Sequence, residues 1–129
     1  MNKIENDISF DIRKCAFKIH NKLGPGLFES VYESALSYEL KQIGHVVKNQ
    51  FPVPLIYGNK NFETGFKLDL LVDDLVVVEV KSVEKLNNVH FKQLLSYIKL
   101  INVKLGLLIN FNSSSLLNKK SIIRIANNL

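Results

Sequence analysis

The sequence predicts a single α/β domain, residues 1–129, with a central mixed β-sheet flanked by helices. Its length fits one domain, and a hydrophobic share of 47% is enough for a core. Before Gly44, apolar residues recur at steps of three and four, which is typical of helices packed on a core. After Gly44 they come in short runs, which indicate strands. The predicted order of elements is α-α-β-β-β-β-α-β.

Two helices are predicted at the start of the chain, over residues 7–22 and 27–43. Asp7 is placed to cap the first helix. The Gly-Pro-Gly turn at 24–26 ends this helix, because glycine suits the position after a helix and proline cannot continue one. Gly44 ends the second helix.

Four strands follow, over residues 46–50, 53–57, 66–72 and 75–81. Pro52 and Pro54 place the first two strands at an edge of the sheet, where a missing N–H group is tolerated. The fourth strand is apolar on both faces except at its end, so we expect it to be central.

The last third of the chain supplies one more helix and at least one more strand. Asn87 or Asn88 is placed to cap a helix over residues 89–101. An apolar run at 104–111 predicts a buried strand. Residues 121–126 fit either a short strand or a short helix, and the sequence leaves this choice open.

Charge and cysteine content limit the classes of function. The net charge of +5 and the isoelectric point of about 9.3 permit a polyanionic partner without requiring one. A basic cluster at Lys119, Lys120 and Arg124 fits a solvated face better than a nucleic-acid contact. The lone cysteine, Cys15, excludes an internal disulfide and a cysteine-based zinc or iron–sulfur cage, and its helical position predicts a core role.

No apolar run reaches the roughly 18 residues of a transmembrane helix. The polar N-terminus also lacks the apolar segment of a signal peptide. We therefore expect a cytoplasmic protein with no membrane role.

Asp69, Glu79 and Lys81 break the apolar pattern of the central strands. Glu79 and Lys81 are two positions apart on a strand, so their side chains share a face. Burying a charged side chain is expensive unless it is paired or binds a cation, and places where such rules fail are often functional. A salt bridge between Glu79 and Lys81 at the strand end is an equally simple alternative.

The loop between these two strands decides whether the acids meet. A two-residue turn at 73–74 would put Asp69 opposite Val78, on the wrong face. A three-residue loop that also takes in Leu75 would put Asp69 opposite Glu79. We predict the three-residue loop or an equivalent bulge. The two carboxylates would then lie about 5 Å apart and could grip one divalent cation.

These residue types suit hydrolysis of a phosphodiester. Carboxylate oxygens are the ligands that Mg²⁺ and Mn²⁺ prefer. Such a cation polarises a phosphate and lowers the pKa of a bound water. A neighbouring lysine can stabilise the charge of the transition state or orient the water.

The sequence also resembles a known family. Gly26-Leu27-Phe28-Glu29-Ser30-Val31-Tyr32 matches the GxxExxY signature of a family of small proteins placed in the PD-(D/E)xK nuclease superfamily. The likeness runs from about Ile8 to Phe111. Further matching segments are residues 20–26, Asp69, 79–81, 90–97 and 106–111. The resemblance implies a restriction-endonuclease-like core, and Leu68 stands where the superfamily name has proline.

The resemblance implies a role for each acid and for the lysine. Glu29 looks like the helix-borne acid of the superfamily, which binds metal directly or through water. Asp69 looks like the metal-bridging aspartate, and Glu79 with Lys81 looks like the (D/E)xK pair. The implied metal ligands are therefore Glu29, Asp69 and Glu79.

His90, Gln93 and Tyr97 are spaced so that they line one face of the last predicted helix. Gln93 and Tyr97 resemble the QxxxY motif of RecB-type nucleases, which implies that they belong to the catalytic site and hold Lys81 or a phosphate. For Tyr97 the alternative is half-buried packing. His90 is either a supporting site residue or a surface residue.

His20 and Tyr32 are the other candidates for supporting roles. His20 stands beside the Gly-Pro-Gly turn, where it is either an extra metal ligand or substrate contact, or a cap of the helix C-terminus. Tyr32 lies one helical turn after Glu29, so it either supports the site by hydrogen bonding and packing or belongs to the plain core.

Together these observations predict a Mg²⁺- or Mn²⁺-dependent nuclease without an iron–sulfur cluster, acting on nucleic acid with DNA as the favoured substrate. The alternative is a binding module that keeps the fold and binds nucleic acid or a protein without turnover. A homo-oligomer or a protein partner is compatible with both.

Overall fold

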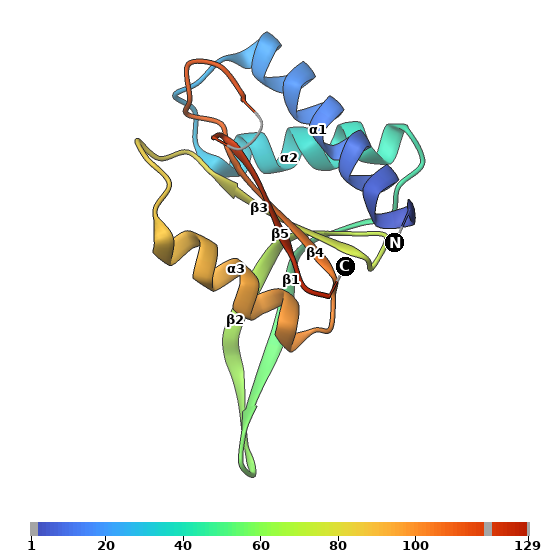
Figure 1. Ribbon diagram of the computed structural model, residues 1–129, viewed down its shortest axis with the longest axis vertical. Coiled ribbons are helices and arrows are strands. Elements are labelled where there is room, and N and C mark those ends of the chain that lie inside the picture. The colour runs from blue at the N-terminus through green and yellow to red at the C-terminus, as the bar shows by residue number, and fades with distance from the viewer. Residues whose placement is uncertain (1–2, 118–119, 129) are drawn as a thin grey trace.

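The computed structural model describes residues 3–117 and 120–128 (Figure 1). Within this part of the chain there are three helices and five strands. Their bounds are α1 Lys3–Leu23, α2 Glu29–Gln42, β1 Val47–Tyr57, β2 Lys60–Val72, β3 Val76–Lys81, α3 Asn88–Leu100, β4 Leu105–Asn110 and β5 Ile122–Ala126. Lys119, one member of the predicted basic cluster, lies outside the described residues. None of the three described helices is long and apolar enough to cross a membrane.

The strands form one mixed sheet in the order β1-β2-β3-β4-β5. β3 and β4 run parallel, and the other neighbouring strands run antiparallel. α3 connects the parallel pair, because parallel neighbours need a long crossover. Helices α1 and α2 cover one face of the sheet and α3 covers the other (Figure 1). The predicted α/β architecture, a central mixed sheet between helices, is confirmed.

The central position predicted for the strand that carries Glu79 is also confirmed, because β3 is buried on both faces. Val78 and Val80 belong to the core shared with α1 and α2. Val77 belongs to the core shared with α3. Glu79 alternates with these valines and therefore lies on the α3 face.

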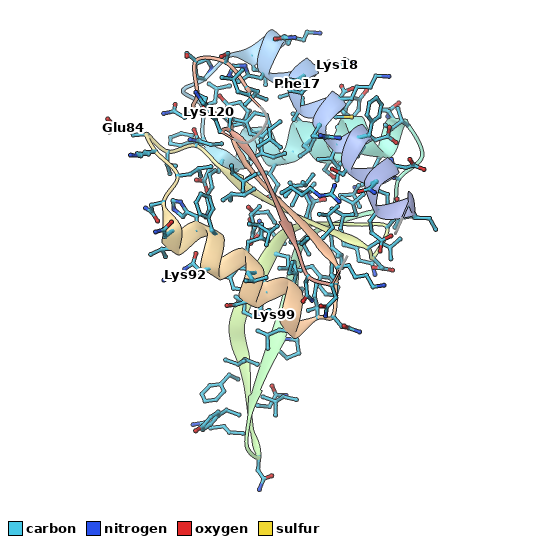
Figure 2. All side chains as sticks on the ribbon, in the orientation of Figure 1. Phe17, Lys18, Glu84, Lys92, Lys99 and Lys120 are labelled. Carbon is cyan, nitrogen blue, oxygen red and sulfur yellow. The ribbon has the colours of Figure 1, made fainter. Side chains whose placement is uncertain are left out.

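Lys92 is on the exposed side of α3 (Figure 2).

Helix α1 begins no later than Lys3, so Asp7 lies inside the helix and the prediction that it caps the helix is wrong. Nothing in residues 3–6 stops a helix, since they include neither proline nor glycine. Cys15 is buried in the core between α1 and the sheet, which confirms its predicted place.

β1 is one continuous strand, where the sequence predicted two short strands. Pro52 and Pro54 are tolerated inside it because β1 is at the edge of the sheet. β2 begins earlier than predicted, so β1 and β2 form a long hairpin that extends beyond the rest of the sheet (Figure 1). At the other end of the chain, β5 decides the open choice for residues 121–126 in favour of a strand.

The loop between β2 and β3 has three residues, Asp73-Asp74-Leu75, because the strand pairing is Leu70↔Val78, Leu71↔Val77 and Val72↔Val76. This is the predicted loop, and the prediction is confirmed. Asp73 and Asp74 adopt positive φ angles of 53° and 56°, a conformation that aspartate accepts more readily than most residues. The same register continued by one step puts Asp69 across from Glu79.

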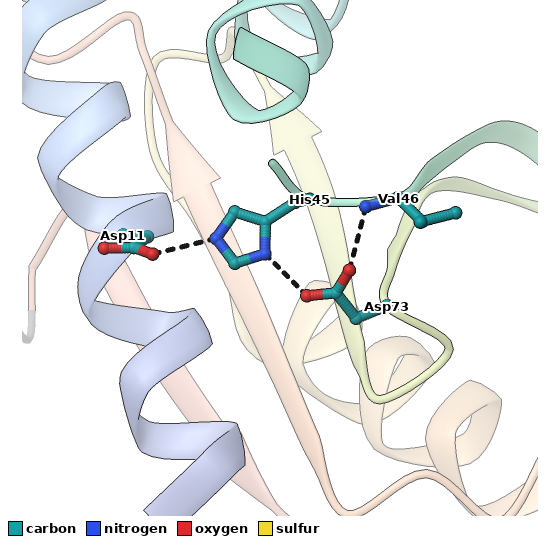
Figure 3. A network of polar contacts seen from close by, with 4 residues as sticks. All are labelled: Asp11, His45, Val46 and Asp73. Atoms are coloured by element: carbon teal, nitrogen blue, oxygen red, sulfur yellow. Dashed lines mark hydrogen bonds and ion pairs between the residues drawn. The ribbon is translucent and has the colours of Figure 1, made fainter. Parts of the chain in front are cut away.

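A polar cluster around His45 joins α1 to this loop (Figure 3). His45 Nδ1 lies 2.5 Å from Asp73 Oδ2, and its Nε2 lies 2.8 Å from Asp11 Oδ2. The Val46 N–H donates to the other Asp73 oxygen at 2.8 Å. Burial lowers the pKa of His45, but the hydrogen bonds and charges of Asp73 and Asp11 outweigh burial and raise this pKa above 6.5. His45 therefore bridges two aspartates from distant parts of the chain.

The start and the middle of α3 are both fixed tightly. The Asn87 side chain caps the helix by accepting a hydrogen bond from the Val89 N–H at 3.0 Å. Further along, α3 lies against β4 at Gly106, where an added Cβ would be 2.9 Å from Leu94 Cδ1. The absence of a side chain at Gly106 thus sets how closely α3 approaches the sheet.

Candidate active site

Asp69 and Glu79 lie side by side across β2 and β3. The Asp69 N–H donates to Glu79 Oε2 at 3.3 Å, and the Val80 N–H donates to Asp69 Oδ2 at 2.8 Å. Each acid is therefore held by the backbone of the strand that carries the other acid. Glu79 is only 7% exposed. The two carboxyl groups are fixed next to each other by the sheet itself.

The proximity of these acids is electrostatically costly. Burial raises the pKa of Glu79 to about 9, and the negative charge of Asp69 adds to this effect, while Lys81 offsets only part of it. Two ionised carboxylates in a desolvated place repel each other. A divalent cation between them would remove that repulsion, so the pair has the chemistry of a cation site.

Asp69 and Glu79 line a cavity of about 150 Å³. Its walls come from α2, β2, β3, α3 and β4. The lining residues are Glu29, Lys67, Asp69, Glu79, Lys81, His90, Gln93, Leu94, Tyr97 and Leu108. The structure therefore brings seven of the nine residues singled out in the sequence to one cavity; His20 and Tyr32 are not among its lining residues.

Glu29 lies in the first turn of α2 and lines the cavity. Its Oε2 accepts a hydrogen bond from the Ser82 N–H at 3.1 Å. The Ser82 hydroxyl in turn donates to the Leu27 carbonyl oxygen at 2.7 Å. These two bonds tie the start of α2 to the residue that follows β3, and they hold the Glu29 carboxylate at the rim.

Within the described residues, no three histidine, cysteine, aspartate or glutamate side chains gather closely enough to hold a metal ion by themselves. The close pair is Asp69 with Glu79. Magnesium is usually bound by one or two carboxylates and keeps several of its waters. A hydrated Mg²⁺ or Mn²⁺ therefore fits the oxygen donors of Asp69 and Glu79, and Glu29 lines the same cavity.

Helix α3 contributes His90, Gln93 and Tyr97 to the cavity wall. The Tyr97 ring stacks on Phe66 of β2, with 4.0 Å between ring centroids. Burial and the charges of Glu79 and Asp69 raise the pKa of Tyr97 above 10, so its hydroxyl keeps its proton and can donate. His90 Nδ1 accepts from the Asn87 N–H at 3.2 Å, so His90 completes the cap of α3 as well as lining the cavity.

The family model of the PD-(D/E)XK nuclease superfamily matches residues 6–125. The chain belongs to the PD-(D/E)XK nuclease superfamily. No curated protein and no solved structure matches it. Membership agrees with the restriction-endonuclease-like arrangement of the sheet and helices and indicates a nuclease-type function. Nucleases of this superfamily typically use divalent metals.

Lys67 and Ser82 contribute to this cavity and were not predicted from the sequence. Lys67 lines the cavity and could have been found, because it precedes Asp69 by two positions on the same strand. Ser82 holds Glu29. Nothing in the sequence marks Ser82, since its role depends on the meeting of segments 53 positions apart.

His20 is not among the residues that line the cavity. It is buried, and its Nε2 lies 2.7 Å from the carbonyl oxygen of Ser113 in the segment after β4. His20 therefore links the end of α1 to a distant loop, because the chain after β4 returns past the helix C-terminus. Its two predicted roles, an extra metal ligand or substrate contact and a cap of the helix C-terminus, stay predictions.

Tyr32 lies in the core and bonds the backbone of the turn before Glu29. Its ring is fully buried and stacks on Phe111, with 4.5 Å between centroids and 6° between the planes. Its hydroxyl donates to the Gly24 carbonyl oxygen at 2.6 Å and accepts from the Leu27 N–H at 3.1 Å. The side chain thereby fixes the turn that leads into Glu29.

Proposed function

We propose that this chain is a metal-dependent nuclease that hydrolyses phosphodiester bonds of nucleic acid, with DNA as the expected substrate. The observation that carries the proposal is the fixed pair of Asp69 and Glu79, which shares one small polar cavity with Lys81. The GxxExxY segment around Glu29 supports placement in the GxxExxY group of the superfamily.

Asp69 and Glu79 would hold Mg²⁺ or Mn²⁺, and Glu29 would reach it through water. When bound, such a cation polarises the phosphate and lowers the pKa of an attacking water. The two acids hold the reacting groups in place because the backbone bonds of β2 and β3 fix their carboxylates in advance.

The basic and polar side chains of the cavity would hold the phosphate. Lys81 is two positions from Glu79 and supplies a positive charge where negative charge grows in the transition state. Lys67 supplies a second ammonium group to the lining of the cavity. Tyr97 and Gln93 donate hydrogen bonds to phosphate oxygens.

The size of the cavity limits what enters it. Pockets that enclose a whole small-molecule ligand have volumes of roughly 300–1,000 Å³, whereas this cavity has about 150 Å³. A phosphate group with its cation and waters fits, and the sugars and bases stay outside. Such a site suits cleavage at the backbone of a polymer.

The decisive test is a cleavage assay on single- and double-stranded DNA and RNA with Mg²⁺, Mn²⁺ or EDTA. We expect metal-dependent cutting that is lost in Asp69→Ala and in Lys81→Ala. Cutting that survives both substitutions would refute the site. Retention of DNA without cutting on any substrate would favour the non-catalytic binding module, and size-exclusion chromatography with and without DNA would detect a homo-oligomer.

A further inference from the structure

Gln50 of β1 lies across from Asp69 of β2, so it stands in one row with Asp69 and Glu79. The pairing of β1 with β2 steps from Asn49↔Leu70 to Phe51↔Leu68, which puts Gln50 level with Asp69. On its other side, Asp69 is level with Glu79. A glutamine on the edge strand thus flanks the acid pair on the side away from β3.

The backbone at Gln50 is unusual for a strand. Its φ angle is +48°, a left-handed conformation that is strained for a residue other than glycine. Gln50 is the one residue of β1 with a positive φ angle, so neither of its neighbours shares this conformation. A local irregularity of this kind re-aims a side chain, and here it turns the Gln50 amide towards two carboxylates.

The amide nitrogen of Gln50 donates to both carboxylates. Nε2 lies 2.6 Å from Glu33 Oε1 and 3.2 Å from Asp69 Oδ1. A side-chain amide nitrogen has two hydrogens, so both bonds form at once. The opposite orientation of the amide would point its carbonyl oxygen at two negative groups, so the charges of Glu33 and Asp69 select the donating orientation.

Glu33 is itself held in place. Asn49 Nδ2 donates to Glu33 Oε2 at 3.2 Å, and the Ser37 hydroxyl donates to Asn49 Oδ1 at 2.8 Å. Ser37 is buried on α2. A chain of side-chain hydrogen bonds therefore runs from helix α2 through Glu33 and Gln50 to Asp69.

With this chain in place, both oxygens of Asp69 have a protein donor: Val80 N–H on Oδ2 and Gln50 on Oδ1. Each carboxylate oxygen still has lone-pair capacity left for a cation. We infer that Gln50, anchored by Glu33, is a positioning residue that fixes the Asp69 carboxylate for divalent-cation binding. This inference rests on the proposed function, because it assumes that Asp69 binds a cation.

The test measures Mn²⁺ binding by calorimetry, which does not require turnover. Outer hydrogen-bond partners of metal ligands typically change metal affinity by about 10- to 100-fold. We expect Gln50→Leu to weaken Mn²⁺ binding by about tenfold or more, and Gln42→Leu, an exposed amide at the end of α2, to leave it unchanged. Asp69→Ala should remove the binding event.

A double-mutant cycle separates positioning from a general structural effect. Glu33→Ala should weaken Mn²⁺ binding in the wild-type background and have no further effect in Gln50→Leu, because Glu33 acts through Gln50. Glu33→Gln keeps an acceptor oxygen and should retain most of the affinity. Thermal melting of the metal-free proteins checks that each variant is folded.

The outcomes distinguish the two hypotheses. If the wild-type protein binds Mn²⁺ and Gln50→Leu binds it equally well, the positioning role is overturned while the proposed function stands. Additive effects of Glu33→Ala and Gln50→Leu would also overturn it. If the wild-type protein binds no Mn²⁺, the cation site of the proposed function fails, and the inference fails with it.

Discussion

The hydroxyl of Tyr32 donates a 2.6 Å hydrogen bond to the carbonyl oxygen of Gly24. This bond fixes the turn between α1 and α2 from within the core, because the Tyr32 ring is completely buried. The same hydroxyl accepts from the Leu27 N–H, two positions before Glu29. Tyr32, which is not among the residues that line the cavity, thus fixes the turn before Glu29, while Ser82 holds the Glu29 carboxylate itself.

Replacing Tyr32 with phenylalanine removes this hydroxyl and keeps the stack on Phe111. The Leu27 N–H and the Gly24 carbonyl lose their partner, and a hydrogen bond of this kind typically contributes about 0.5–1.5 kcal/mol to stability. We expect urea unfolding to show a loss of stability of that size. Tyr38→Phe, at an exposed position on the same helix, should change stability by less than about 0.5 kcal/mol. Equal stability of the two variants would contradict the role of the hydroxyl.

The His45 cluster makes stability depend on pH. The pKa of His45 is raised above 6.5 in the folded protein because hydrogen bonds to Asp73 and Asp11 outweigh the effect of burial. Its stabilising contribution is therefore fully present below pH 6.5, where the unfolded chain is also protonated, and is lost as the pH rises through the folded-state pKa. Unfolding of wild type and of His45→Gln should be compared across that range. We expect the advantage of the wild type to shrink with rising pH, and a constant difference would exclude the linkage.

Gly106 sets the distance between α3 and β4. An alanine Cβ there would lie 2.9 Å from Leu94 Cδ1 and 3.2 Å from Ile98 Cγ2. Overpacking of this kind typically costs about 1–3 kcal/mol, and the shift of α3 would move Gln93 and Tyr97 away from the acids. Gly106→Ala should lower both the melting temperature and nuclease activity.

Leu94→Ala offers the control for Gly106→Ala, because it removes the side chain that the new methyl group meets. The double variant should be more stable than the sum of the two single losses predicts. Strict additivity would show that the contact with Leu94 is not the cause.

The two lysines of the cavity should affect cleavage differently. Lys81 stands beside Glu79, and loss of one preorganised transition-state contact typically lowers kcat by about 10²–10³-fold. Lys67→Ala should mainly raise KM, because Lys67 is exposed and lines the cavity, where in the proposed function it would bind the substrate phosphate before reaction. Lys92→Ala on the exposed side of α3 is the matched control and should leave both constants unchanged. A fall in kcat for Lys67→Ala as large as that for Lys81→Ala would contradict this division of roles.

The meeting of Asp69 with Glu79 could be predicted because side chains alternate along strands, so the length of one loop decides which residues share a face. The face of α3 that carries Gln93 and Tyr97 followed from helical spacing in the same way. Both are local rules that a sequence displays directly.

Other features depend on contacts between segments far apart in the chain. The bond from His20 to Ser113 and the cluster of His45 with two aspartates form only after α1, the loop after β4 and the β2–β3 loop have packed. No sequence pattern points to Gln50, because its hydrogen bond to Asp69 depends on a left-handed backbone conformation inside an edge strand. The predicted helix start at Asp7 was wrong because a possible cap residue is acceptable inside a helix when nothing before it breaks the helix.

The loop Asp73-Asp74-Leu75 makes the spacing between the acids as important as their identity. With the Val72↔Val76 pair kept, deletion of Leu75 would only shorten the loop, and Asp69 would still face Glu79. Deletion of Leu70 inside β2 would also leave every motif letter of the chain unchanged, yet Asp69 would then face Val78, on the other side of the sheet from Glu79. A homologue with one residue fewer between its aspartate and the loop could therefore match the superfamily pattern and still hold its two acids on opposite faces. Among such relatives, the number of residues between each acid and the loop should separate active from inactive proteins.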